Sequence, residues 1–179
     1  MVELMAQSPV SSRLPLEIGG VTLALAEPGR VTWVAVRDDG ALASALEEEV
    51  GCGLPTALRS TTASGLRLVW HGPGQVLAIG ALPSALAGLP MTDQSDGFAC
   101  LALSGHGARD VLARLTPVDL RGHVFPVDGA ARTLLGHMTA TLIREGDAAW
   151  LCLVPRSMAD SAVHDLTRAM EGVAGRATL

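Results

Sequence analysis

The stretch "FACLALSGHGARDVLARL", residues 98–115, predicts a strand, a tight glycine turn and a helix. A Gly-x-Gly at such a junction can cradle the pyrophosphate of a dinucleotide. Here Asp110 stands where the third glycine of that fingerprint belongs, and its carboxylate would compete with a phosphate for the positive end of the helix. We therefore interpret Gly105 and Gly107 as corner residues rather than as a nucleotide-binding loop.

The same order of elements is predicted twice along the chain. In the first half we expect strands at 31–36, 66–71 and 75–79, and helices at 40–50 and 84–89. In the second half we expect strands at 98–103, 133–143 and 148–154, and helices at 108–115 and 157–171. Each half thus has a β-α-β-β-α pattern, and Gly72 falls on Gly146 when the halves are aligned. The pattern predicts an α+β fold of mostly antiparallel sheets with helices on one face.

The domain organisation follows from this duplication. We expect residues 1–15 to form an amino-terminal tail or arm, and residues 16–179 to form a single domain. The two pseudo-repeats in that domain would span about residues 29–90 and 97–172.

Two details of the second half support the predicted elements. The segment 133–143 alternates in polarity with Gly136 inside it, which indicates one long strand. The last helix has the spacing of a capping box at Ser157 and Asp160, and Gly172 is expected to end it.

Composition excludes several classes of function. Net charge is −5, so a nucleic acid is not an expected partner. The sequence has no lysine, which removes Schiff-base and P-loop chemistry, and no tyrosine to stack on a flavin or pterin ring. The three cysteines and five histidines show no metal-ligand spacing. No apolar run is long enough for a membrane span and no signal-peptide pattern opens the chain, so we expect a soluble, cytoplasmic protein.

Several segments together resemble the gamma subunit family of heterotetrameric sarcosine oxidase. They are "WHGPGQVL" (70–77), "TDQSDGFACLALSG" (92–105), "ARLTPVDL" (113–120), "FPVDGAARTLLGHM" (125–138) and "GDAAWLCLVPRSMADS" (146–161). The resemblance implies a fold related to the amino-terminal part of the glycine-cleavage T-proteins, the folate-binding aminomethyltransferases. It also implies a complex that oxidatively demethylates sarcosine to glycine and can pass the methyl carbon to tetrahydrofolate.

In that family, FAD, FMN, NAD, tetrahydrofolate and zinc belong to the alpha, beta and delta subunits, so the resemblance implies no cofactor, metal or catalytic residue in this chain. Asp96 is the position nearest to the T-protein catalytic aspartate. We expect a non-catalytic structural gamma subunit that contacts its partners through polar residues of the matching segments. The candidate interface residues are Arg132, His137, Arg144 and Arg156. The alternative is a stand-alone folate-binding or folate-dependent protein.

Overall fold

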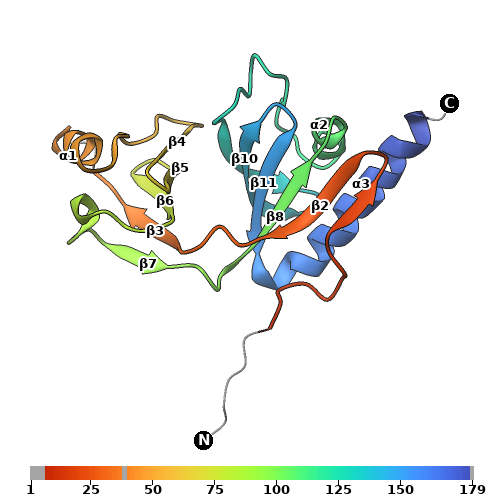
Figure 1. Ribbon diagram of the computed structural model, residues 1–179, viewed down its shortest axis with the longest axis horizontal. Helices are drawn as coiled ribbons and strands as arrows, with labels where there is room; N and C mark the ends of the chain where they lie inside the picture. Colours follow the sequence, from red (N-terminus) through yellow and green to blue (C-terminus); the bar gives the residue numbers. More distant parts are fainter. Residues whose placement is uncertain (1–6, 38–39, 178–179) are drawn as a thin grey trace, which may run out of the picture.

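The computed structural model describes residues 7–37 and 40–177, and its strands form two antiparallel sheets in two lobes (Figure 1). The six-stranded sheet has the order β1 (Leu16–Ile18), β2 (Val21–Ala26), β8 (Phe98–Ser104), β11 (Ala149–Pro155), β10 (Met138–Gly146), β9 (Ala130–Leu135). The five-stranded sheet has the order β4 (Ser60–Ala63), β5 (Leu66–Gly72), β6 (Gln75–Ile79), β3 (Val31–Ala35), β7 (Met91–Asp93).

Each sheet is covered by helices on one face only. Helices α2 (Ala108–Leu112) and α3 (Ala159–Ala177) pack on the six-stranded sheet around buried side chains such as Leu101 and Leu166. Helix α1 (Ala41–Val50) and the 3-10 turn η1 (Ser84–Leu86) cover the five-stranded sheet. A third apolar cluster, which includes Val69 and Leu153, joins the two sheets face to face. The α+β class and the antiparallel sheets with helices on one face are therefore confirmed.

The duplication is visible in the backbone hydrogen bonds that join the two lobes. We call residues 31–86 the first unit and residues 98–177 the second unit. The N–H of Ser60 donates to the carbonyl of Asp128, and the N–H of Ala130 donates to the carbonyl of Leu58, around an antiparallel bridge between Arg59 and Gly129. Each bond has its counterpart in the other unit, so the lobes meet about a local pseudo-twofold axis.

The predicted equivalence of Gly72 and Gly146 is confirmed by the strand register. A bulge interrupts the β5–β6 pairing between Trp70 and Gly72, and the same irregularity interrupts the β10–β11 pairing between Arg144 and Gly146. The two hairpins have the same register at this point, so Trp70 is equivalent to Arg144.

The strand that precedes each unit pairs with the sheet of the other unit, since β7 lies before the second unit as β2 lies before the first. Strand β2 precedes the first unit in sequence but pairs with β8 of the second unit. Strand β7 follows the first unit and pairs with its β3. The two connections cross between the lobes in the lower part of Figure 1.

Several sequence-based boundaries are wrong. The expected long strand at 133–143 is two strands, because Gly136 adopts a left-handed φ of +59° and turns the chain between β9 and β10. Strand β4 was missed, so each unit has three strands between its helices instead of two. Gly172 does not end the last helix, which continues to Ala177. Asp160 does not close a capping box but accepts a bond from the N–H of Ser11.

The described part of the arm, residues 7–15, lies against the second unit. The side chain of Val10 is buried in the core formed with α2 and α3. The bond from Ser11 to Asp160 holds the arm at the start of α3. None of the helices in the described ranges combines the length and the hydropathy that a bilayer crossing requires.

Candidate partner-binding surface

Gly105 and Gly107 occupy a close backbone approach rather than a ligand-binding loop. Gly105 has a φ of +115°, and a Cβ at this position would lie 2.1 Å from the carbonyl oxygen of Gly20. A Cβ on Gly107 would lie 2.9 Å from the side chain of Val21. The two glycines therefore allow the turn before α2 to pack directly on the start of β2.

Arg132 lies on the exposed part of β9, on the face of the larger sheet that turns toward the smaller one. No carboxylate within the described ranges forms an ion pair with it. Its charge acts on His71 of β5, whose pKa is lowered first by burial and second by Arg132. The Nδ1 atom of His71 is buried and has no hydrogen-bond partner among the described residues. Arg132 is thus a free cation beside a neutral, half-buried imidazole.

His137 lies close to Arg132 in the sequence but in a different setting. It follows Gly136 in the turn between β9 and β10 and is exposed. Between the two candidates, Leu134 leaves 46% of its surface exposed. Arg132, Leu134 and His137 thus place a cation, an apolar side chain and an imidazole at one end of β9.

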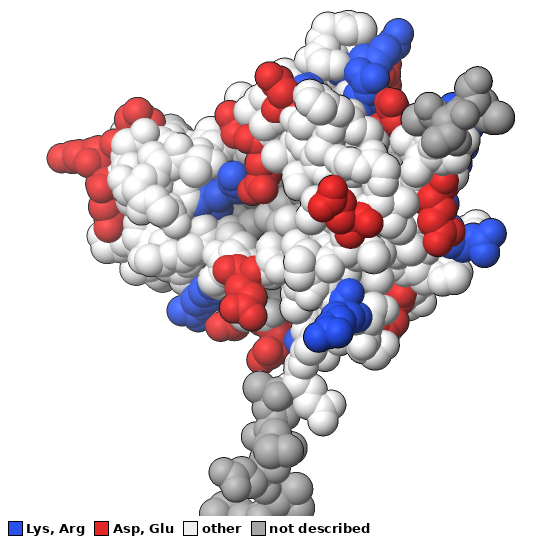
Figure 2. Space-filling model, turned by 45° about the vertical axis from the view of Figure 1, so that its right-hand side comes forward, with Lys and Arg blue, Asp and Glu red and all other residues white. Residues whose placement is uncertain are grey.

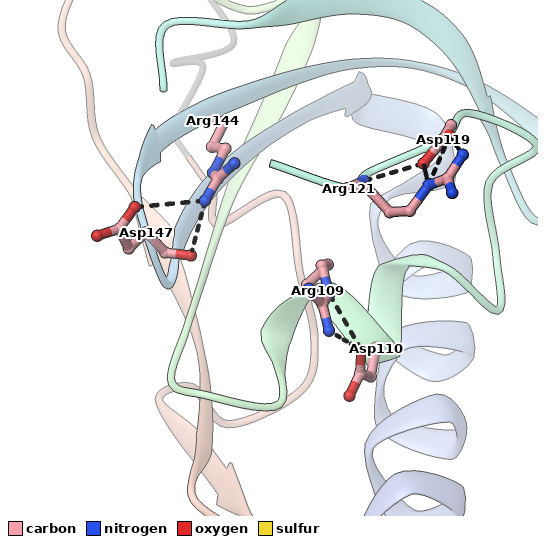
Figure 3. Close-up of polar contacts among 6 residues, drawn as sticks. All are labelled: Arg109, Asp110, Asp119, Arg121, Arg144 and Asp147. Atoms are coloured by element: carbon pink, nitrogen blue, oxygen red, sulfur yellow. Dashed lines mark hydrogen bonds and ion pairs between the residues drawn. The ribbon is translucent and has the colours of Figure 1, made fainter. Parts of the chain in front are cut away.

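Arg144, another candidate interface residue, is not exposed on the surface of this chain. It is only 9% exposed, and its guanidinium donates to the carbonyls of Phe125 (2.8 Å), Gly146 (3.1 Å) and Asp147 (3.3 Å). Figure 3 shows the guanidinium directed at Asp147 in the β10–β11 turn. The guanidinium also lies 5.6 Å from the ring centroid of Trp150. Arg144 therefore stabilises its own chain, and these bonds occupy its donors.

Arg156 is half-buried where the arm meets the second unit. Its Nη2 donates to the carbonyl of Gln7. It lines a hollow of about 660 Å³ together with Asp96, Glu27 and the arm. Figure 2 shows that the surface is hollowed between the two lobes and that acidic and basic side chains both lie around this hollow. Sequence reasoning named Arg156 and Asp96 separately, and the structure brings them to one hollow.

The cysteine at this hollow is not an activated nucleophile. Burial raises the pKa of Cys100 to about 11, and that of Cys152, buried behind it, to about 12. All three cysteines are free. In the described ranges, no three His, Cys, Asp or Glu side chains gather as metal ligands would. The residues present do not fit a metal centre or a thiolate site.

An apolar patch was missed by sequence reasoning. Leu58, Val124 and Val127 are 53%, 49% and 41% exposed, and the backbone bonds between the lobes bring Leu58 next to the loop that carries the two valines. These residues have no helical or strand periodicity, because they lie in loops before β4 and β9.

Three comparisons with known proteins agree. The model of the sarcosine oxidase gamma subunit family matches residues 35–170. The chain is 34% identical over 139 residues to the sarcosine oxidase subunit gamma of Arthrobacter sp., covering 71% of this chain and 68% of that protein.

A solved structure also has the same fold along nearly its whole length. It is a chain of the heterotetrameric sarcosine oxidase from Corynebacterium sp. U-96 in complex with pyrrole 2-carboxylate. The TM-score is 0.76 at 27% identity, and the match covers 89% of this chain and 88% of that chain. Because the family model spans more than half of the sequence, the chain belongs to the sarcosine oxidase gamma subunit family.

Proposed function

We propose that this chain is a non-catalytic structural subunit of a heterotetrameric sarcosine oxidase, in which it packs against the T-protein-like part of the alpha subunit. The observation that carries the proposal is the near-complete match to one chain of a heterotetrameric enzyme. In this complex, sarcosine is oxidatively demethylated to glycine. FAD, FMN, NAD, tetrahydrofolate and zinc are held by the alpha, beta and delta subunits.

The polar surface supports a docking role. Arg132 is an exposed cation without an ion pair among the described residues, and Leu134 beside it is exposed. An acidic group on a partner would neutralise Arg132, and apolar contact would cover Leu134. His137 and Arg156 lie at two further positions from which a partner could be reached.

The three free, buried cysteines support a reducing compartment, and we place the complex in the cytoplasm. The stand-alone folate-binding alternative is not favoured, because the family and its members are named as subunits of the oxidase. Titration of the purified chain with tetrahydrofolate in a calorimeter checks this. No heat is expected at high micromolar folate.

Co-expression of the other three subunits with and without this chain tests the proposal. Without the chain, we expect the yield of assembled complex and the total sarcosine turnover to fall together. Normal assembly and turnover in its absence would contradict the proposal.

Single substitutions then locate the contacts. Arg132→Ala, His137→Ala and Arg156→Ala are expected to lower the yield of complex while the chain itself remains folded. A residue whose alanine variant gives an unchanged yield is removed from the interface.

A further inference from the structure

A hollow of about 510 Å³ lies on the first unit, between α1 and the β5–β6 turn. Its walls come from Ala43 of α1, from residues 54–57 and from Trp70 and Val76 of the hairpin. None of the side chains that line it is charged. A space of this size and polarity suits an apolar group.

The second unit has the same backbone around the equivalent place. Trp70 donates its N–H to the carbonyl of Arg59, and Arg144 donates its N–H to that of Gly129. Trp70 pairs with Val76 across its hairpin, as Arg144 pairs with Trp150. Arg59 donates to the carbonyl of Thr56, and Gly129 donates to that of Pro126, which makes Pro55 equivalent to Phe125.

In the second unit, side chains of the chain itself fill the equivalent place. The rings of Phe125 and Trp150 are stacked with their centroids 5.7 Å apart. The guanidinium of Arg144 lies over Trp150 and binds the carbonyl of Phe125. All three side chains are buried, so nothing from outside can enter.

In the first unit two of the three equivalent positions carry smaller side chains. Proline replaces phenylalanine at position 55, and valine replaces tryptophan at position 76. Trp70 lies where Arg144 does but remains partly exposed. The space that two aromatic rings occupy in one unit is therefore open in the other.

Leu58 lies at the rim of the hollow, where its side chain is exposed and its backbone has an unfavourable conformation. Leu58, directly after the wall residue Ala57, is 53% exposed and has a φ of +61°. A branched side chain rarely takes this left-handed conformation, which glycine adopts freely. The equivalent residue of the second unit, Asp128, has a φ of +63°, so the shared turn sets this conformation, and the first unit places an exposed leucine in it.

We propose that a partner subunit of the oxidase inserts an aromatic side chain into this hollow and covers Leu58 and Val127 with apolar surface. The inserted ring would take the place that Phe125 and Trp150 fill in the second unit. The inference rests on the proposed function, because it requires the chain to work within a complex. Aromatic anchors in desolvated pockets are typical of such interfaces.

Ala57→Glu tests the insertion with little risk to the fold, because Ala57 is exposed and its new carboxylate would stand in the wall of the hollow. Ala45→Glu is the matched control, since Ala45 is also exposed but lies on the part of α1 outside this hollow. In pull-downs through a tag on the chain, Ala57→Glu is expected to lower recovery of the other subunits about tenfold, as the loss of one buried anchor does. Ala45→Glu is expected to change it little.

Val76→Trp is a second variant that fills the hollow with the residue of the second unit. We expect the full chain to keep its melting temperature while co-purification falls. If this variant fails to fold, the pull-down with Ala57→Glu still tests the insertion. Failure of the wild-type chain to recover any partner would refute the proposed function. Recovery by the wild type that Ala57→Glu leaves unchanged would overturn the insertion alone, as would a hollow that proves to bind a second copy of the chain.

Discussion

The two units of this chain share one backbone and use it in opposite ways. At the bulge near the end of β10, the second unit buries Arg144, Phe125 and Trp150 against one another. At the equivalent bulge near the end of β5, the first unit leaves an uncharged hollow beside Trp70. Duplication has thus kept the main-chain hydrogen bonds while the side chains diverged. One unit forms a closed core, and the other presents a surface that we assign to a partner.

The largest effect that separates the units is expected at the equivalent pair Trp150 and Val76. Trp150→Ala should lower the free energy of unfolding by about 3–5 kcal/mol, because it removes a ring from a filled core. Val76→Ala should cost about 1–2 kcal/mol, because it removes two buried methyl groups but no aromatic ring. Urea unfolding of the two variants measures both, and equal losses would contradict the difference between the units.

The second largest effect is expected at Arg144. Arg144→Ala should destabilise the chain by about 2–3 kcal/mol, because it leaves the carbonyls of Phe125, Gly146 and Asp147 without their charged donor. Arg132→Ala should change stability by less than about 0.5 kcal/mol, since Arg132 is exposed. Thermal unfolding of the two variants compares them. A stable Arg144→Ala chain that failed only in assembly would restore the interface role.

A smaller effect is expected at Leu58. Leu58→Gly relieves a left-handed φ, so unfolding free energy should stay level or rise by up to about 1 kcal/mol. Leu134→Gly is the control, because Leu134 is similarly exposed but lies within β9, where glycine should cost about 0.5–1 kcal/mol. Melting temperatures that fall equally in both variants would contradict the conformational argument.

The smallest effect concerns His71, whose pKa is lowered from 6.5 by burial and by Arg132. A lowered pKa means that the unfolded chain binds the proton more readily, so this contribution to stability is complete above about pH 6.5 and is lost as the pH falls. His71→Gln should therefore lose less stability than the wild type between pH 7 and pH 5. Urea unfolding at pH 7 and at pH 5 measures this slope, and an unchanged slope in His71→Gln would refute this role.

Periodicity and glycine spacing in the sequence predicted the elements whose signals are local. The apolar strand before Gly105, the amphipathic last helix and the match of Gly72 to Gly146 all depend on local patterns that the fold preserves. Strands β1, β2 and β7 were missed because β1 and β7 are only three residues long, and because β2 and β7 pair with strands that are distant in sequence. A single strand was predicted across Gly136, because the alternation of polar and apolar residues does not reveal that Gly136 has a positive φ.

The candidate residues divide in the same way. Arg132 and His137 were chosen as polar residues of the segments that resemble the family, and both are exposed. The burial of Arg144 could not be foreseen, because the carbonyls that satisfy it include that of Phe125, 19 residues away, and its ring partner lies on the next strand. The hollow beside Trp70 could not be predicted from the sequence either. It arises because Pro55 and Val76 are smaller than the equivalent Phe125 and Trp150, and this equivalence is known only from the structure.

Native mass spectrometry of material purified through a tag on this chain tests the structural-subunit account most directly. The account predicts one dominant species that contains this chain together with the three other sarcosine oxidase subunits. Recovery of this chain alone or as a self-associated species, under conditions in which the other subunits are expressed and soluble, would contradict it.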